Sequence, residues 1–115
     1  MGTVNINEYG INVELSVFLF REDNIYHAYS PELDIVGYDN TEEGAKRSFE
    51  IALKEYIDYT LINKTLEADL LAHGWKKTEK GKVSVPQMIY LLKKPQVQRV
   101  LQKKEFSKYS VPVTL

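Results

Sequence analysis

Residues 13–38 read VELSVFLFREDNIYHAYSPELDIVGY, and this stretch decides the fold. Its first nine residues are rich in β-branched and aromatic side chains, and the apolar odd-numbered positions share one face of an extended strand. Glu22-Asp23-Asn24 has turn chemistry, and residues 25–29 resume the extended pattern, so a hairpin is expected. Proline cannot donate to a strand ladder, so Pro31 ends the second strand. Residues 33–38 then predict a third, short strand.

A long amphipathic helix is predicted next. Thr41 can cap its first turn, and Glu42 and Glu43 stand where the helix dipole favours negative charge. Gly44 occupies the position where a capping-box Glu would stand, so the box is incomplete. Apolar and small residues then recur at steps of three and four: Ala45, Phe49, Ala52, Leu53, Tyr56, Ile57 and Thr60. This stripe must pack on the sheet.

The chain beyond residue 62 is less regular. Three leucines between residues 66 and 71 predict a shorter helix that ends at Gly74. His73 precedes this glycine and is expected to complete the C-terminal dipole of that helix. Trp75 is expected to anchor the following tail on the core, because a buried indole contributes a large apolar area.

The remainder of the tail contains two prolines that indicate helix starts. Residues 76–82 form a lysine-rich connector with a turn expected at Gly81. Pro86 is placed like the first residue of a helix, ahead of a short apolar stripe. Pro95 is placed in the same way ahead of a second stripe. The apolar residues are Met88, Leu91 and Leu92 in the first stripe, and Val97, Val100 and Leu101 in the second.

The order of elements predicts the fold class. Residues 109–113 have the composition of a closing strand, which Pro112 would restrict to a sheet edge. We therefore expect an α+β fold (β-β-β-α-β) with an antiparallel sheet of three to four strands, packed by one long helix, and a helical C-terminal extension. A chain of 115 residues fits a single domain, 1–115, with its core at about 12–62 and the extension at about 63–115. An uncovered sheet edge predicts a homodimer.

Composition narrows the class of protein. The chain has no cysteine, which excludes a disulfide framework and a thiolate metal site. No apolar run approaches the roughly 20 residues that a membrane-spanning helix needs. The first ten residues lack the basic start and apolar stretch of a signal peptide. Together these features predict a cytoplasmic protein without membrane association.

The net charge of −1 hides an asymmetry between the two halves. Residues 1–62 carry 12 acidic and 4 basic side chains, a net charge of −8, whereas residues 63–115 carry 4 acidic and 11 basic ones, a net charge of +7. Such polarity indicates an acidic face for a basic partner, a basic face for nucleic acid, or two halves that attract each other.

Residues 26–33, Tyr-His-Ala-Tyr-Ser-Pro-Glu-Leu, followed by Gly37, Thr41-Glu42-Glu43 and Ala45, resemble the signature of the HicB-like antitoxins. The stretch from Phe49 to Trp75 is similar to a long-tailed subgroup. The resemblance implies a truncated ribonuclease-H-like core that binds a small basic HicA-like toxin, an RNA-cleaving protein, and neutralises it by occluding its active surface. Many members also carry a helix-turn-helix or ribbon-helix-helix domain and repress their own operon, but the tail here is too short and irregular to match either.

An acidic group around the third strand and the helix entry is the candidate partner surface, because complementary fields steer a basic partner. Its residues are Glu32, Asp34, Tyr38, Asp39, Glu42 and Glu43. The alternative is loop solubility together with helix-dipole satisfaction. A two-metal nuclease needs carboxylates that converge on paired ions, whereas these lie mostly on one short loop. We therefore expect neither an enzyme nor a cofactor.

The basic tail is the candidate for nucleic acid. Its suggested contacts are Lys93, Lys94, Arg99, Lys103 and Lys104, on two short helices. The second hypothesis for function is accordingly a stand-alone HicB-like module that regulates transcription through this half. We favour instead a packed tail whose lysines stay solvated, or one that clasps the acidic half of a second subunit, so nucleic acid is not the preferred partner.

Overall fold

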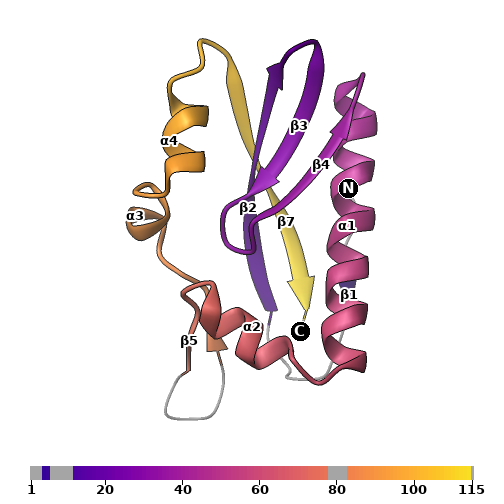
Figure 1. The fold of residues 1–115 in the computed structure, drawn as a ribbon, viewed down its shortest axis with the longest axis vertical. Coiled ribbons are helices and arrows are strands. Elements are labelled where there is room, and N and C mark those ends of the chain that lie inside the picture. The colour runs from indigo at the N-terminus through magenta and orange to yellow at the C-terminus, as the bar shows by residue number, and fades with distance from the viewer. Residues whose placement is uncertain (1–3, 6–11, 78–82, 115) are drawn as a thin grey trace.

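The computed structural model describes residues 4–5, 12–77 and 83–114. The strands of its main sheet are β1 (Val4–Asn5), β2 (Asn12–Glu22), β3 (Ile25–Ser30), β4 (Ile35–Asp39) and β7 (Phe106–Thr114). Their order is β1-β7-β2-β3-β4, and the last four pair antiparallel. The helices are α1 (Glu42–Ile62), α2 (Leu66–Ala72), α3 (Met88–Leu91) and α4 (Pro95–Leu101). Figure 1 shows α1 on one side of the sheet and α3 and α4 on the other. The predicted α+β fold is confirmed.

The β2–β3 hairpin follows the local sequence closely. Asp23 and Asn24 form its two-residue turn, with φ of 54° and 64°. Asp and Asn tolerate this left-handed conformation, whose twist suits a tight hairpin. β3 ends at Ser30, directly before the proline, as predicted. The third strand begins at residue 35 and not at 33, because Asp34 has a left-handed φ of 54° that interrupts an extended chain.

The start of α1 confirms the predicted cap. The backbone N–H of Gly44 donates to the Thr41 hydroxyl at 3.0 Å. The structure also explains why a glycine stands where a capping-box Glu is usual. A Cβ at residue 44 would lie 1.3 Å from Oδ2 of Asp39. The glycine therefore lacks the side chain that would complete the capping box, and its small size lets the end of β4 lie close to the helix.

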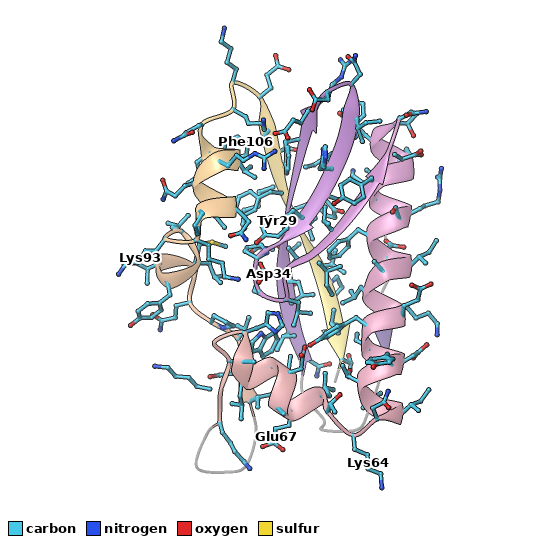
Figure 2. All side chains as sticks on the ribbon, viewed as in Figure 1. Tyr29, Asp34, Lys64, Glu67, Lys93 and Phe106 are labelled. Carbon is cyan, nitrogen blue, oxygen red and sulfur yellow. The ribbon has the colours of Figure 1, made fainter. Side chains whose placement is uncertain are left out.

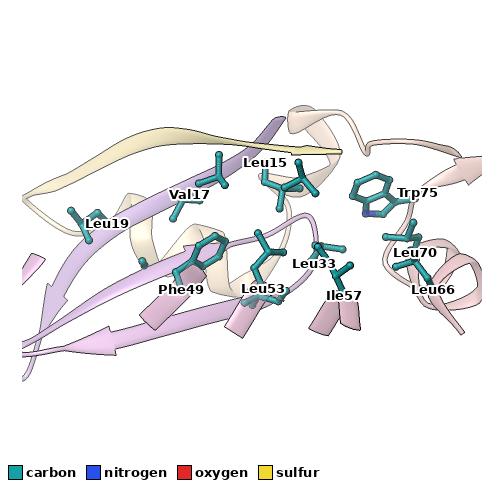
Figure 3. Packing of buried hydrophobic residues seen from close by; sticks show 14 of the residues in the cluster. Leu15, Val17, Leu19, Leu33, Phe49, Leu53, Ile57, Leu66, Leu70 and Trp75 are labelled. Carbon is teal, nitrogen blue, oxygen red and sulfur yellow. The ribbon is translucent and has the colours of Figure 1, made fainter. Parts of the chain in front are cut away.

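A second glycine brings α1 and the sheet together. A Cβ at Gly37 would lie 2.2 Å from the backbone nitrogen of Phe49, so no larger residue fits there without moving the helix. Phe49, Leu53 and Ile57 project from α1 into the core and are fully buried. They meet the odd-numbered residues of β2, Leu15, Val17 and Leu19, as the sequence predicts (Figure 3). Each such side chain contributes about 1.5–3 kcal/mol to folding by its burial.

The tail packs on the core where the sequence places its anchor. α2 buries Leu66 and Leu70, and Gly74 follows it with φ of 90°. Trp75 is buried, and its indole Nε1 donates to the backbone oxygen of Glu32 at 2.9 Å. This contact across the chain confirms the predicted anchor.

The connector after Trp75 contains two short strands that were not predicted. β5 (Lys76–Lys77) pairs antiparallel with β6 (Val83–Ser84), and the turn expected at Gly81 lies outside the described residues. α3 starts two residues later than predicted, because Gln87 before it has an extended ψ of 144°. α4 starts at Pro95, as predicted.

The second face of the sheet is also covered, which the single-helix prediction did not include. Val97 and Val100 of α4 pack on Phe18 and Tyr29, the even-numbered face of β2 and its neighbour on β3. Phe18 also meets the edge of Phe106 at 6.1 Å. Part of the sheet is therefore buried on both faces, and the extension completes a second small core.

The closing strand is longer and more central than predicted. β7 pairs with β2 at nine positions, from Asn12 opposite Thr114 to Phe20 opposite Phe106. Among the described residues, β1 joins the other side of β7 only at Val113 and Thr114, so the expected edge position holds for Pro112 and the residues before it but not for these last two. Pro112 therefore needs no ladder partner on that side. β1 was not predicted. Among the described residues, no helix has both the length and the apolar composition to cross a bilayer.

Candidate functional site

The six residues predicted as a partner surface divide into two groups. Glu32 belongs to the interior, since only 3% of it is exposed. Its carboxylate accepts the backbone N–H of Ser16 at 2.9 Å and the hydroxyl of Ser30 at 3.0 Å. β3 ends at Ser30 while β2 continues, so the N–H of Ser16 has lost its strand partner and the carboxylate replaces it. The prediction of Glu32 as a partner contact is therefore wrong.

Asp34 is also engaged within the chain. It accepts the Tyr29 hydroxyl at 2.6 Å and the Lys94 ammonium at 2.9 Å, and Nε2 of His73 lies 3.9 Å away. Figure 2 shows Tyr29 and Asp34 together between the sheet and α3–α4. Partial burial opposes ionisation, but these hydrogen bonds and the charges of Lys94 and His73 outweigh it, so the pKa of Asp34 is lowered. Burial, followed by the bond to Asp34, raises the pKa of Tyr29.

The other four residues are neighbours at one end of β4, and we call them the acidic corner: Tyr38, Asp39, Glu42 and Glu43. It lies where β4 ends and α1 begins, and all four are exposed, Tyr38 by 55%. Within the described part of the chain, its three carboxylates form no ion pair. Asp39 accepts a hydrogen bond of 3.4 Å from the Thr41 hydroxyl.

An aromatic row connects the acidic corner to a cleft. Tyr38 meets the edge of His27 at 5.0 Å, and His27 stacks on Phe20 at 4.9 Å, so one ring from each of β4, β3 and β2 lies in line. Nδ1 of His27 lies 3.1 Å from the backbone oxygen of Ile25. The row borders a cleft of about 420 Å³ between the sheet and α4, which Arg99 also lines. Because side chains alternate across a strand, Tyr38 lies with this row on the α4 face of the sheet, whereas Asp39, next to Gly44, lies on the α1 face.

The predicted basic contacts behave differently from the acidic corner. The ammonium of Lys94 holds Asp34 and the backbone oxygen of Pro31, the latter at 3.0 Å. Arg99 and Lys103 both pair with Glu22, which the sequence did not single out. The bond from Lys103, aided by Arg99, lowers the pKa of Glu22. These three cations bind the acidic half of their own chain. Of the arrangements that the charge asymmetry allowed, this is the one in which the two halves attract each other.

Two exposed predicted basic contacts, Lys93 and Lys104, form no ion pair among the described residues. Figure 2 shows Lys93 on the outer side of α3. His73 is the C-cap residue of α2, and its Nδ1 lies 2.8 Å from the backbone oxygen of Asp69, at the helix end as predicted. In the residues that the structure describes, no three His, Cys, Asp or Glu side chains are grouped to hold a metal ion.

Comparison with known proteins adds no relative: no family model, curated protein or solved structure matches this chain. The geometry of the acidic corner and of the tail must therefore carry the functional argument.

Proposed function

We propose that this protein captures a basic protein partner on the acidic corner and, in the manner of the HicB-like antitoxins that its sequence resembles, neutralises a small basic HicA-like RNA-cleaving toxin by covering its active surface. The observation that carries this proposal is that some carboxylates are bonded within the fold whereas others are exposed. Glu32, Asp34 and Glu22 serve the fold, whereas the three carboxylates of the corner are exposed and form no ion pair with any residue that the structure describes.

The composition of the corner supports a protein partner. Three carboxylates within five residues produce a local field that steers a basic surface and selects it over acidic ones. The helix dipole accounts for part of the stability of Glu42 and Glu43, but Asp39 lies outside the helix. Exposed Tyr38, at the same end of β4 but on the opposite face of the sheet, is of the type of side chain that dominates binding energy in interfaces. A toxin that grips RNA needs a basic surface, which is the complement of this corner.

Nucleic acid on α4 is less well supported. A phosphate contact needs a free cation, and Lys94, Arg99 and Lys103 already hold carboxylates within the chain. Binding there would first have to break these pairs. The homodimer expected from the sheet edge stays a prediction. Analytical ultracentrifugation tests it by measuring the mass of the protein in solution.

Affinity purification from the native host, with mass spectrometry of the bound material, tests the proposal first. We expect a stoichiometric basic protein of well under about 100 residues. The affinity of the recovered partner is then measured for a variant that carries Asp39→Asn, Glu42→Gln and Glu43→Gln. The matched control carries Glu14→Gln, Asp23→Asn and Glu55→Gln, which removes the same charge from other exposed positions.

We expect the corner variant to lose at least about tenfold in affinity and the control to stay within about twofold. Equal losses in both variants would show that only net charge matters, and they would refute the acidic corner as the site. Recovery of the protein without any partner, repeated after cross-linking, would refute the antitoxin role.

A further inference from the structure

A second surface lies on the tail, between the β5–β6 pair and α3. It is a groove of about 590 Å³, and none of its lining residues belongs to the acidic corner. The wall on the α3 side carries Tyr90, whose side chain is 58% exposed. Ser84 and Gln87, both exposed, also line the groove. An aromatic ring is thus presented to solvent beside groups that donate and accept hydrogen bonds.

Two lysines flank this ring. The ammonium nitrogens of Lys76 and Lys93 each lie 5.9 Å from the centroid of Tyr90. Within the described residues, neither lysine has a carboxylate partner. Their direct neighbours in sequence do: Lys77 holds Glu67 at 2.8 Å, and Lys94 holds Asp34 at 2.9 Å. In each of these two neighbouring pairs of lysines, the cation that faces the ring is the one without a carboxylate partner in the described residues.

We propose that this groove binds single-stranded nucleic acid, with a base stacked on Tyr90 and the adjoining phosphates on Lys76 and Lys93. Base stacking on an exposed aromatic ring, with cations that follow the backbone, is how proteins hold single strands without reading their sequence. The hydroxyl of Ser84 and the amide of Gln87 can meet base edges or sugar. The site goes beyond the proposed function, because no residue of the acidic corner takes part in it.

Other polyanions fit the groove less well. An acidic peptide would neutralise the lysines but would place no flat ring against Tyr90. A duplex keeps its bases stacked inside and offers no base face to the ring. One ring beside two cations that have no carboxylate partner in the described residues therefore favours a strand whose bases are unpaired.

Fluorescence anisotropy with labelled 15-nucleotide oligo(U) and oligo(dT) tests the site. We expect saturable binding of at least one of the two, and the tighter one identifies RNA or DNA as the source. The full-length protein with Tyr90→Ala should bind about tenfold more weakly, because a stacked base contributes this much or more. Tyr90→Phe should retain the affinity, because it keeps the ring. Tyr59→Ala is the matched control, since Tyr59 is 67% exposed on α1.

The lysines have their own readout. Two phosphate contacts give a slope of log affinity against log salt of about −1.4 for a single strand. Lys76→Gln with Lys93→Gln should reduce this slope towards zero. Lys104→Gln with Lys108→Gln removes the same charge from exposed positions elsewhere and should leave it unchanged. Circular dichroism verifies that each variant is folded.

Three results would overturn the proposal. They are no binding of either oligonucleotide in low salt, equal weakening by Tyr90→Ala and Tyr59→Ala, and equal binding of a 15-base-pair duplex or a poly-glutamate peptide. The corner variant should bind the oligonucleotides at least as tightly as the wild type. Failure of this site and failure of the proposed function are therefore distinguishable.

Discussion

Two groups of carboxylates, only a few residues apart, have opposite fates in this molecule. Glu32 and Asp34, in the β3–β4 loop, hold a strand end and the tail in place. Asp39 and Glu43, at the corner between β4 and α1, remain exposed without an ion pair in the described residues. Glu32 lies where β3 ends beside β2, so its carboxylate replaces the missing strand partner. The difference teaches that an acidic residue is held by the fold where strand pairing leaves a backbone group without a partner.

The largest effect expected from this comparison is the loss of the buried carboxylate. Glu32→Gln keeps an oxygen for Ser16 N–H but turns the other position into an amide donor, so the Ser30 hydroxyl must accept and both bonds become neutral. We expect unfolding by urea to show a loss of about 1–2 kcal/mol, since hydrogen bonds to a charged group contribute more than neutral ones. Glu43→Gln is the matched control and should change stability by less than about 0.5 kcal/mol. Similar losses in the two variants would remove the distinction between the groups.

An intermediate effect is expected at Asp34. Asn tolerates its left-handed backbone, so Asp34→Asn removes the charge without straining the chain. The lowered pKa means that ionised Asp34 stabilises the fold above its ordinary value of 3.8, and this contribution is lost as pH falls through the lower folded pKa. Because the side chain is 39% exposed, solvent screening keeps the effect below about 1 kcal/mol at neutral pH.

Urea unfolding between about pH 6 and pH 2 measures this contribution. The difference in stability between wild type and Asp34→Asn should be constant near neutral pH and shrink on acidification. A difference that persists at the acid end would show that the lost energy comes from packing and not from the charge.

The smallest effect is expected at Asp39. Asp39→Asn makes the same chemical change as Asp34→Asn, five residues later, on a side chain without an ion pair in the described chain. Stability should stay within about 0.5 kcal/mol of the wild type at every pH. A loss as large as that of Asp34→Asn would mean that the acidic corner is held by the fold and is not free for a partner.

The sequence predicts most of the local structure, because its signals act over a few residues. The Asp23-Asn24 turn, the Thr41 cap and the Trp75 anchor all follow from single residues and their neighbours. The second helical layer, formed by α3 and α4, does not follow from such local signals. One feature of β2 nevertheless indicates it. Residues 17–20 are all apolar, which breaks the alternation of a strand with one wet face and indicates burial on both faces.

The candidate site was predictable only in part, for a related reason. The composition identifies the acidic cluster, but burial of Glu32 depends on where β3 stops relative to β2. The pairing of Glu22 with Arg99 and Lys103 joins segments nearly 80 residues apart, and no local pattern encodes such a contact. The opposite charges of the two halves indicated the attraction without naming the residues.

The pairing of β7 with β2 has a consequence for how the chain folds. Asn12 and Thr114 bond across a separation of 102 residues, so a central pair of strands depends on segments made far apart in time. At about 5–20 residues per second, β2 waits on the order of ten seconds on the ribosome before β7 exists. The hairpin and α1 can assemble meanwhile, but one side of β2 stays open. We therefore expect slow folding, governed by loop closure, and an interval in which a passing strand could take the place of β7.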